Sequence, residues 1–447
     1  MKEIYETFDT LLEDLAAEYG DKPAIAFHPN DEEEYITYAE LKTAIFDKAE
    51  EYVKQYGNPH RVPRDENDKP PATILIHELL SKDWIIDAVG AIVAGFQTAL
   101  VDVTVEDDDI PRVWENCIEY HPESFLFFTS GTTSKGRAVV LTQTALLRCA
   151  WNGQKMLPCS SKDRLLSVLP LTHVFGFVCG FLWPLTQGAT IQLGTGVRGL
   201  ATDPVNYKPT MISLVPTMLK FLLQVDGLNP ELGIILVGGG PCDQSLIDAT
   251  RRKGVSLYFG YGLTETASGI AISSREGDPY AMRLCPDTLI EIGEKGELLV
   301  KTPCIMESYY NDPEATRRKL VDGWFHTGDL AFVDRGTLHV IGRMTDVMVL
   351  PGGEKMFCTE LEAQLSSKLQ RDVALCLRDN ELTIIVVASE HSRREIEHQI
   401  DQWNDRTSDS RQIRRIEIRT APLPRSGTGK LQRWKLYTSD SDSYRPG

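Results

Sequence analysis

The sequence predicts an α/β protein. A large N-terminal domain of α/β layers, with parallel sheets and a small antiparallel β region, is followed by a small α+β domain. Strand-like and helix-like segments alternate between Thr73 and Phe259, which is typical of parallel sheets. From Gly296 onward the pattern changes to short strands. The charge changes as well, because the segment from Val347 is close to neutral whereas the whole chain has a formal net charge of −17.

The first elements form a predicted βαβ unit. Thr37 and Glu40 make a capping box at the start of a helix that ends near Gly57. A strand, a helix and a second strand follow at residues 73–76, 82–94 and 98–103. Two strands joined by a helical crossover are expected to pair in parallel.

The later elements continue this alternation and then change. Thr142 is the expected cap of a helix. The expected strands and helices after it are residues 211–215, 217–224, 233–237, 244–252 and 256–259. The expected antiparallel strands are residues 297–301, 331–333 and 337–341. In the small domain we expect helices at residues 359–369 and 393–404, the first with a capping box of Thr359 and Glu362, and strands at residues 373–377, 382–388 and 413–418.

Composition limits the classes of function. The chain has 447 residues, of which 42% are hydrophobic and 25% charged, which is typical of a globular protein with two or three domains. The net charge of −17 argues against a nucleic acid or an anionic membrane as a partner. Nine cysteines occur without a CxxC pair or a spacing suited to zinc. We therefore interpret them as reduced core residues of a cytoplasmic protein.

The longest apolar stretch, Leu165–Leu185, is long enough to span a bilayer. Pro170, His173 and Gly176 interrupt it, and no basic cluster follows it. The N-terminus is acidic and lacks the apolar core of a secretory signal. We therefore expect a buried strand and helix that line a cavity, and no membrane span.

The segment Ser124–Thr142 contains a Gly/Ser/Thr-rich loop between two β-prone runs. Glycines allow backbone N–H groups to approach an anion, and hydroxyls and Arg137 supply further donors. A Walker loop is excluded because Arg137 and Ala138 follow Gly136, where that motif requires Lys and then Ser or Thr. The sequence therefore predicts a phosphate-binding loop between two strands, with a plain hairpin turn as the alternative.

Five further segments carry residue types suited to a nucleotide site, although each also fits a plainer turn, core or linker. The segments are Gly238–Pro241, Tyr258–Glu265, Gly323–Asp329, Gly342–Glu354 and Pro424–Lys430. The three glycines let a flat base lie on bare backbone. Glu265 is a hard oxygen ligand for magnesium. Asp329, which is expected directly after a glycine turn, can accept both hydroxyls of a ribose.

The order and spacing of these segments resemble the acyl-adenylate-forming (AMP-binding) superfamily. It includes acyl-CoA synthetases, carrier-protein adenylation domains and firefly-type luciferases. The matching motifs are TSGTTSKGRAV at 129–139, PLTHVFGF at 170–177, GGGP at 238–241, YGLTET at 261–266, GWFHTGDL at 323–330, GRMTDV at 342–347 and PRSGTGKLQR at 424–433. The resemblance extends from about Thr37 to Arg433, and six or seven motifs in one order are not expected by accident.

The resemblance implies an enzyme with two half-reactions. A carboxylate attacks the α-phosphate of ATP to give acyl-AMP and pyrophosphate, and a thiol then takes the acyl group and releases AMP. ATP, Mg²⁺ and CoA, or the phosphopantetheine of an acyl carrier protein, are the implied cofactors. The implied nucleotide ligands are Thr129, Ser130, Gly131, Thr132, Thr133 and Arg137 for the β- and γ-phosphates, Gly239, Gly240, Pro241 and Tyr261 for adenine, and Asp329 and Arg343 for the ribose.

The resemblance also implies catalytic roles. Lys430 is the main catalytic cation of adenylation, Glu265 binds magnesium, and Thr264 contacts the α-phosphate. His173 stands at the carboxylate end of the acyl pocket. Residues 1–345 are then the large domain with the ATP and acyl sites, and residues 346–447 are a small mobile domain that carries the lysine, with Asp346 as the hinge.

The phosphate loop departs from the usual TSGTTGxPKG pattern of the family. Ser134, Gly136, Arg137 and Ala138 stand at its Gly, Pro, Lys and Gly. Arg137 keeps a cation in the loop, but the backbone of the loop must differ.

The expected substrate is a carboxylic acid, with a fatty or aryl acid favoured over an amino acid, for which no buried Asp candidate is evident. Phe175, Phe177, Phe181 and Trp183 either line an apolar acyl pocket or belong to the core. We therefore expect an acid–CoA ligase. The alternatives are a free-standing adenylation enzyme that loads a carrier protein and a non-catalytic nucleotide-binding protein. The arginines that suit either thiol partner are Arg411, Arg414, Arg415 and Arg419.

Overall fold

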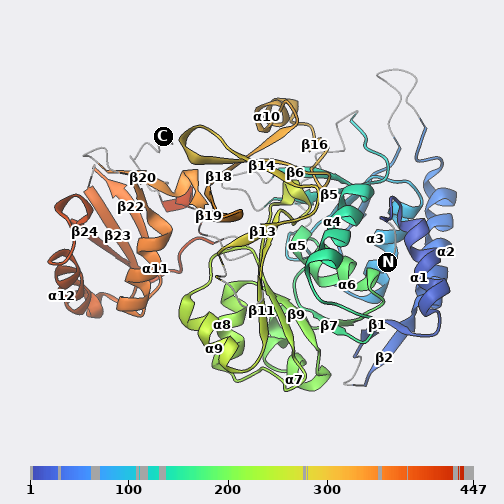
Figure 1. Cartoon of the computed structure of the whole chain (residues 1–447), viewed down its shortest axis with the longest axis horizontal. Helices are drawn as coiled ribbons and strands as arrows, with labels where there is room; N and C mark the ends of the chain where they lie inside the picture. Colours follow the sequence, from blue (N-terminus) through green and yellow to red (C-terminus); the bar gives the residue numbers. More distant parts are fainter. Residues whose placement is uncertain are drawn as a thin grey trace.

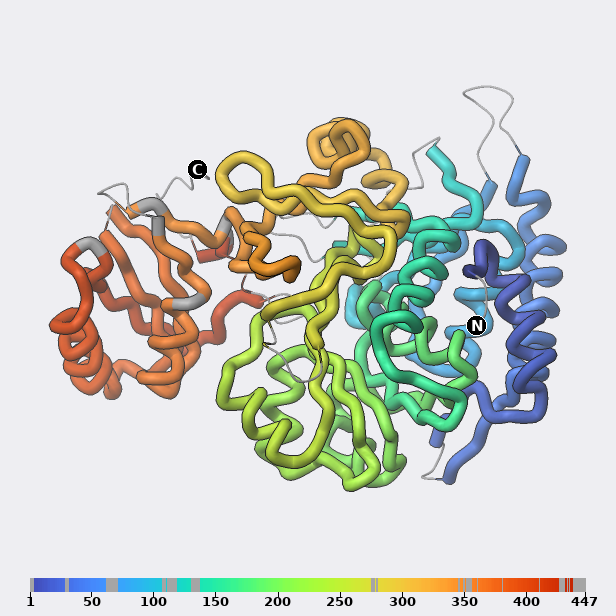
Figure 2. Tube along the Cα trace, viewed as in Figure 1, coloured from blue at the N-terminus to red at the C-terminus, as the bar shows by residue number. Residues whose placement is uncertain are grey.

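The computed structural model in Figure 1 consists of a large body and a smaller C-terminal unit beside it. The described residues are 4–28, 32–61, 71–106, 110, 119–129, 137–274, 278, 280–350, 355–379, 381–425, 431 and 433–436. The tube in Figure 2 shows that the C-terminal unit, coloured orange to red, is formed by one continuous end of the chain. The predicted α/β fold class is confirmed.

The large body contains a long mixed sheet. Its strand order is β14-β15-β18-β19-β13-β12-β11-β10-β9-β7-β8-β1-β2, and β17 pairs with β18. Its strands are β1 (Pro23–Phe27), β2 (Glu34–Thr37), β7 (Arg164–Ser167), β8 (Thr190–Leu193), β9 (Met211–Leu214), β10 (Ile234–Val237), β11 (Ser256–Tyr261), β12 (Ala271–Ser273), β13 (Met282–Leu284), β14 (Leu289–Ile292), β15 (Glu297–Lys301), β17 (Leu320–Val321), β18 (Trp324–Asp334) and β19 (Thr337–Arg343). The run from β8 through β7, β9 and β10 to β11 is parallel, and the strands from β12 to β19 pair antiparallel.

A second sheet lies beside the first and carries the predicted phosphate loop. Its strands, in spatial order, are β16 (Ser308–Tyr309), β6 (Ala138–Thr142), β5 (Ser124–Phe128), β4 (Thr98–Leu100) and β3 (Ile74–Ile76). β3 and β4 pair in parallel around α3, which confirms the predicted βαβ unit. β5 and β6 pair antiparallel, so the loop between them joins two strands as predicted.

Helices cover the sheets of the large body, with α1 and α2 at the outer side in Figure 1. They are α1 (Phe8–Tyr19), α2 (Tyr38–Tyr56), α3 (Lys82–Val93), α4 (Gln143–Met156), α5 (Val174–Phe177), the π-helix η3 (Val178–Leu182), α6 (Trp183–Thr186), α7 (Asp203–Tyr207), α8 (Pro216–Gln224), α9 (Gln244–Arg252) and α10 (Pro313–Lys319). Short 3₁₀ turns are η4 (Gly196–Ala201), η5 (Thr264–Thr266), η6 (Glu294–Gly296) and η7 (Met344–Asp346). The capping box of Thr37 and Glu40 is present, and α2 ends before Gly57 as predicted.

The C-terminal unit has its own core of apolar side chains from Met348 to Ile413. Its elements are β20 (Val347–Val349), β21 (Lys355–Phe357), α11 (Cys358–Leu369), β22 (Val373–Arg378), β23 (Glu381–Val387), η8 (Glu390–Ser392), α12 (Arg393–Asn404), η9 (Asp409–Arg411), β24 (Arg415–Arg419) and η10 (Arg433–Leu436). β22, β23 and β24 form one small sheet. This separate core agrees with a small α+β domain, while the boundary and hinge at Asp346 stay predictions.

One local prediction is wrong. α11 begins at Cys358 with Phe357 as its N-cap, so Thr359 and Glu362 do not form a capping box. The Glu362 carboxylate instead binds the Arg433 guanidinium at 2.7 Å. The glycine turn predicted before Asp329 is present at Gly323, between β17 and β18, and Asp329 follows it inside β18.

The apolar stretch Leu165–Leu185 is a buried part of the core. It forms β7 and the consecutive helices α5, η3 and α6, in which Phe177, Phe181 and Trp183 are at most 1% exposed. These three aromatics therefore belong to the core rather than to an open acyl pocket. Within the described part of the chain, no helix is long and apolar enough to cross a membrane.

Candidate functional site

Asp329, Arg343 and Tyr261 meet at one point of the large sheet, and we call them the Asp329 cluster. Asp329 and Arg343 are cross-strand partners on β18 and β19, and Arg343 Nε lies 2.8 Å from Asp329 Oδ1. Tyr261, the last residue of β11, donates its hydroxyl to Asp329 Oδ2 at 2.6 Å. Because residues directly opposite in an antiparallel pair are neighbours, strand pairing fixes the Asp329–Arg343 pair.

The electrostatics of the Asp329 cluster favour a charged carboxylate. The Asp329 side chain is 5% exposed and that of Arg343 is 42% exposed. Burial and the Asp329 carboxylate raise the pKa of the Tyr261 hydroxyl well above its ordinary value, so Tyr261 stays a donor. Burial alone would lower the pKa of Arg343, but the Asp329 carboxylate raises it. A carboxylate offers about four lone-pair sites, so Asp329 can accept further hydroxyl donors.

Glu265, Tyr309 and Arg137 form a second group, which we call the Glu265 cluster. The Tyr309 hydroxyl donates to Glu265 Oε1 at 2.6 Å. The Arg137 guanidinium lies 5.3 Å from the centroid of the Tyr309 ring. Arg137 Nε also lies 3.5 Å from Asp312 Oδ2, and both of these side chains are 38% exposed. Burial and the Glu265 carboxylate raise the pKa of Tyr309, so a neutral phenol holds the carboxylate.

Three segments bring the Glu265 cluster together. Tyr309 is opposite Val139 where β16 pairs with β6, and Arg137 directly precedes β6. The backbone N–H of Met306 donates to the Glu265 carbonyl at 2.7 Å, which joins the chain before β16 to η5. Tyr309 was not among the predicted site residues, because a tyrosine in a short edge strand has no local pattern that separates it from a core aromatic.

The two clusters are neighbours. The charges of Glu265 and Asp346, like that of Asp329, act to raise the pKa of Arg343. Asp346 in turn accepts a hydrogen bond from Arg433 Nε at 3.1 Å, so it is tied to the C-terminal unit. Thr264 lies in the same turn as Glu265 and is half-buried.

The base of the predicted phosphate loop is closed by Thr129 and Arg137. The Arg137 N–H donates to Thr129 Oγ1 at 3.2 Å, and the Thr129 N–H donates to the Arg137 carbonyl at 2.9 Å. The predicted site residues that lie outside the described residues are Ser130, Gly131, Thr132, Thr133 and Lys430, together with Ser134 and Gly136. Their roles stay predictions.

The glycine segment after β10 leaves backbone open at the carboxyl ends of the parallel strands, where ligands bind in open α/β sheets. A Cβ on Gly238 would lie 2.8 Å from Cζ of Phe175, so only glycine allows this ring to lie against the chain. Gly239 has a φ of +82°, which favours glycine. Gly239, Gly240 and Pro241 are exposed, as a surface for a planar base requires.

His173 precedes α5 and lies near the Asp102 carboxylate. Burial lowers the pKa of the His173 imidazole, and the charge of Asp102 offsets only part of this effect. Burial acts to raise the pKa of Asp102, but hydrogen bonds from Thr104 and Thr172 lower it overall. Thr104 Oγ1 lies 2.6 Å and Thr172 Oγ1 3.4 Å from the carboxylate. A neutral imidazole beside a fixed carboxylate can orient an incoming acid without a proton transfer.

The residues present fit a magnesium nucleotide. Asp329 supplies acceptors for a diol, and Arg343 and Arg137 supply cations. Glu265 has one oxygen bound by Tyr309 and a second that can coordinate a cation. Among the described residues no group of three or more His, Cys, Asp or Glu side chains is arranged to hold a metal ion. A magnesium ion at Glu265 would therefore need phosphate oxygens and waters as its other ligands, which is usual for this ion.

A family model described as AMP-binding enzyme matches residues 104–310. The 2-succinylbenzoate–CoA ligase of Bacillus subtilis is 34% identical over 259 residues, which are 54% of this chain and 53% of that protein. The match thus spans about half the length of that relative. A feruloyl-CoA synthase from an Amycolatopsis species is 30% identical over 322 residues, which are 66% of this chain and 63% of that protein.

Solved structures share the fold over nearly the whole chain. The o-succinylbenzoate CoA synthetase of Bacillus subtilis with its acyl-adenylate intermediate gives a TM-score of 0.79 at 23% identity, covering 97% of this chain and 99% of that one. Its complex with ATP and magnesium gives 0.74 at 23% identity, covering 95% and 98%. The motifs, the family model over residues 104–310 and the fold all agree with the acyl-adenylate-forming (AMP-binding) superfamily, to whose members this chain is similar.

Proposed function

We propose that this protein is an AMP-forming, magnesium-dependent acid–CoA ligase that acts on an aryl acid. It converts the acid to acyl-AMP with release of pyrophosphate and then to an acyl-CoA thioester. The aryl preference is supported by the relatives, whose names specify 2-succinylbenzoate and ferulate as substrates. These names give no support to a fatty acid, which was the other favoured class.

One observation carries the proposal. The Asp329 cluster and the Glu265 cluster both adjoin the carboxyl end of β11, where Tyr261 is the last strand residue and Glu265 follows in η5, although their residues come from five separate segments. A carboxylate for a diol, a carboxylate for a hard cation and two arginines are the groups that a magnesium nucleotide requires. A protein that used this fold only as a scaffold would have no need of this combination.

The proposed roles follow this arrangement. Asp329 and Arg343 bind the ribose, and Gly239 to Pro241 with Tyr261 bind the adenine. Thr129 to Thr133 and Arg137 bind the β- and γ-phosphates. Glu265 holds the magnesium, Thr264 contacts the α-phosphate, His173 orients the acid, and Lys430 bridges the acid and the α-phosphate. Residues 346–447 then move as a unit about Asp346 between the two half-reactions.

The adenylation step needs placed positive charge more than proton transfer. The acid oxygen forms a bond to the α-phosphorus, and the bond from that phosphorus to the bridging oxygen breaks with its electron pair leaving on pyrophosphate. Cations that are already in position lower the cost of the negative charge that develops on the phosphate oxygens. Magnesium, when bound, neutralises part of this charge. His173 is neutral, so it can donate to the acid without competing for the role of Lys430.

The test is pyrophosphate release from ATP and magnesium with 2-succinylbenzoate, ferulate, a long-chain fatty acid and an amino acid, each with and without CoA. We expect release with an aryl acid, acceleration by CoA and an acyl-CoA product identified by mass spectrometry. Glu265→Gln should abolish release, whereas Glu294→Gln, an exposed glutamate, should not change it.

Other results would redirect the proposal. Release that CoA does not accelerate would favour the alternative that the thiol belongs to the phosphopantetheine of a carrier protein. Release with the fatty acid alone would overturn the aryl preference. Nucleotide binding without acid-dependent release would contradict the enzyme and favour a non-catalytic nucleotide-binding protein. The chemistry consumes ATP, and the described cysteines are free thiols, so we also propose a cytoplasmic location.

A further inference from the structure

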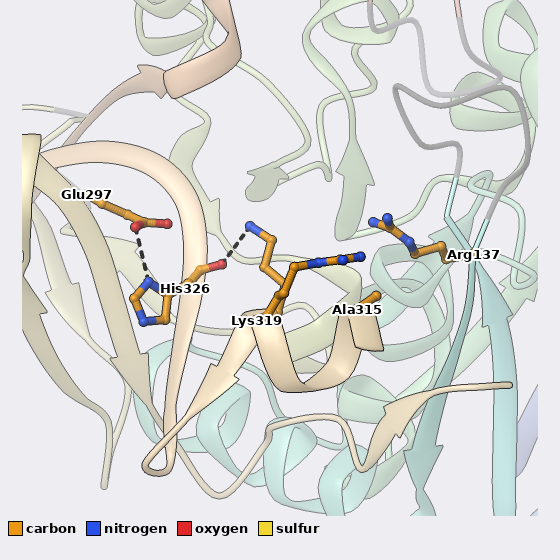
Figure 3. Close-up of a pocket in the computed structure, with 6 residues that line it drawn as sticks. Arg137, Glu297, Ala315, Lys319 and His326 are labelled. Carbon is orange, nitrogen blue, oxygen red and sulfur yellow. Dashed lines mark hydrogen bonds and ion pairs between the residues drawn. The ribbon is translucent and has the colours of Figure 1, made fainter. Parts of the chain in front are cut away.

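A cavity of about 260 Å³ opens beside the Glu265 cluster and is lined mainly by cations. Its lining residues are Arg137, Glu297, Ala315, Arg318, Lys319 and His326. Figure 3 shows Lys319 on α10 and Arg137 beside β6 on two sides of this space. The lining carboxylate, Glu297, is already bound by His326 Nδ1 at 3.1 Å and by the Gly328 N–H at 2.9 Å. The cavity therefore presents a net positive charge to a ligand.

Lys319 is the least expected member of this set. Three cations, Arg317, Arg318 and Lys319, end α10, and cations at a helix C-terminus are normally explained by the helix dipole. Arg317 and Arg318 fit that explanation because they are exposed. Lys319 does not, because its side chain turns inward and its ammonium donates to the His326 carbonyl at 2.9 Å.

The Lys319 ammonium has N–H donors beyond the one that the His326 carbonyl accepts. An ammonium has three N–H donors, and the described residues supply one acceptor, the His326 carbonyl. Burial lowers the pKa of Lys319, while the carboxylates of Glu297, Glu265 and Asp329 act to raise it. A half-buried cation with unused donors is stabilised by an anion that enters the cavity.

Lys319 lies near residues of both clusters. A Cβ on Gly328 would lie 3.3 Å from Lys319 Nζ and 4.0 Å from Arg343 Nη1, so the ammonium lies next to the backbone that precedes Asp329. On the other side, Arg137 lies on the ring of Tyr309, which binds Glu265. The cavity thus lies between the residues proposed for the ribose and the residue proposed for magnesium, where the polyphosphate of a bound ATP has to run.

We propose that Lys319 binds the β- and γ-phosphates of ATP, and the pyrophosphate that they become, from outside the predicted phosphate loop and across the cavity from Arg137 of that loop. This inference rests on the proposed function and extends it by assigning the pyrophosphate site to α10. The two cations neutralise the charge that moves onto pyrophosphate when the α-phosphorus–oxygen bond breaks, and no proton is transferred.

The test is calorimetric binding of magnesium pyrophosphate, magnesium ATP and AMP to the full chain, because binding does not depend on turnover. Lys319→Met should weaken pyrophosphate and ATP binding about tenfold and change AMP binding less than about threefold, which corresponds to loss of one charge-assisted contact. Lys319→Arg keeps the charge and should restore most of the loss. Arg317→Gln, on the exposed side of the same helix, is the matched control and should change nothing.

Each outcome of these titrations supports or contradicts the assignment of Lys319 to the β- and γ-phosphates. Equal weakening of AMP and ATP would show that Lys319 acts through Asp329, and unchanged binding of all three ligands would show that Lys319 only caps the His326 carbonyl. Either result overturns this inference while leaving the proposed function intact. A wild-type chain that binds neither ATP nor pyrophosphate would overturn both. Unfolding midpoints of the variants, expected to stay within a few degrees of the wild type, exclude misfolding as the cause of any loss.

Discussion

The arginine of the Asp329 cluster is held at a buried carboxylate by strand pairing, whereas the arginine of the Glu265 cluster is held by an exposed ion pair. In the first, β18 and β19 place Asp329 opposite Arg343, and the carboxylate is 5% exposed. In the second, Arg137 is 38% exposed and its carboxylate partner is the equally exposed Asp312 at 3.5 Å. An exposed pair of this kind contributes between about 0 and 1 kcal/mol. A phosphate can therefore displace Asp312 at little cost.

The two halves of the proposed nucleotide site therefore differ in how far their side chains are ordered before a ligand binds. The nucleoside half is preorganised, because sheet register and two short hydrogen bonds fix Asp329 before any ligand arrives. In the phosphate half, the Arg137 side chain has only an exposed ion pair with Asp312 at 3.5 Å, so we expect it to gain order from the charge of its ligand. Substitutions in the first half should affect every adenine nucleotide, and substitutions in the second half should affect only those with a polyphosphate.

The largest expected effect is that of a residue in neither cluster. Lys430→Ala should slow acyl-AMP formation by about 10²–10³-fold, because it removes the main cation at the developing charge. Thiolysis of supplied acyl-AMP should stay nearly unchanged. Single-turnover measurements of each half-reaction check this, with Lys162→Ala as a surface control. Equal losses in both half-reactions would contradict a lysine that acts only in the first.

Removal of the Asp329 carboxylate should be the next largest effect. Asp329→Ala should weaken ATP and AMP binding alike, by about 10- to 100-fold, because hydrogen bonds to a charged group are worth about 1.5–3 kcal/mol. Calorimetric titration with both nucleotides measures this. Asp334→Ala, at the exposed end of the same strand, is the control. Unchanged AMP affinity would remove Asp329 from the ribose site.

Arg137→Met should give the clearest difference between the effects on ATP binding and on AMP binding. We expect about tenfold weaker ATP binding, because one charge-assisted contact to phosphate is lost, and unchanged AMP binding. Competition titrations with ATP and AMP measure the ratio, and Arg317→Met is the matched control. If AMP binding fell as much as ATP binding, the two clusters would act as one unit and the comparison would fail.

The smallest expected effect concerns pH. His121 lies between the carboxylates of Glu119 and Glu307, at 2.9 Å from each, and so ties the segment before Tyr309 to the chain before β5. Burial alone would lower the pKa of His121, but hydrogen bonds from its protonated ring to Glu307 and Glu119 raise it overall. The stabilisation is therefore fully present below the unfolded-state pKa and is lost as pH rises through the folded-state pKa.

We expect this loss to be at most about 1 kcal/mol of unfolding free energy, because Glu307 is 47% exposed. Denaturant unfolding of the wild type between about pH 6 and pH 9 measures it. His121→Gln should remove the pH dependence. An identical slope in the wild type and the variant would assign the pH dependence to other groups. His398, which is exposed in α12, is the control histidine for the same substitution.

Sequence analysis predicted most elements of the fold because their signals are local. The cap at Thr142, the glycine after α2 and the alternation from β9 to β11 need only a few neighbouring residues to be recognised. The failures occurred where a distant partner competed with a local one. Glu362 has the spacing of a capping box with Thr359, but the buried Arg433 guanidinium, 71 residues away, binds its carboxylate instead.

The site shows the same division. Motif spacing identified Asp329, Arg343, Tyr261 and Glu265 as candidates, but it did not predict the hydrogen bond from Tyr261 to Asp329. Tyr309 and Lys319 were missed, because neither lies in a motif and each gains its position from packing. Of the four aromatics offered for the acyl pocket, three are core residues and Phe175 lies against Gly238.

Short stretches of the chain specify the types of element, the resemblance to the superfamily and the chemical groups available for the site, because periodicity, capping and motifs can be recognised within them. Which of these groups come into contact depends on the tertiary fold. Tyr261 reaches Asp329 across 68 residues, and Tyr309 reaches Glu265 across 44. Contacts over such separations depend on the order of strands in the sheets and on the helices packed against them. No local pattern in the chain encodes that order.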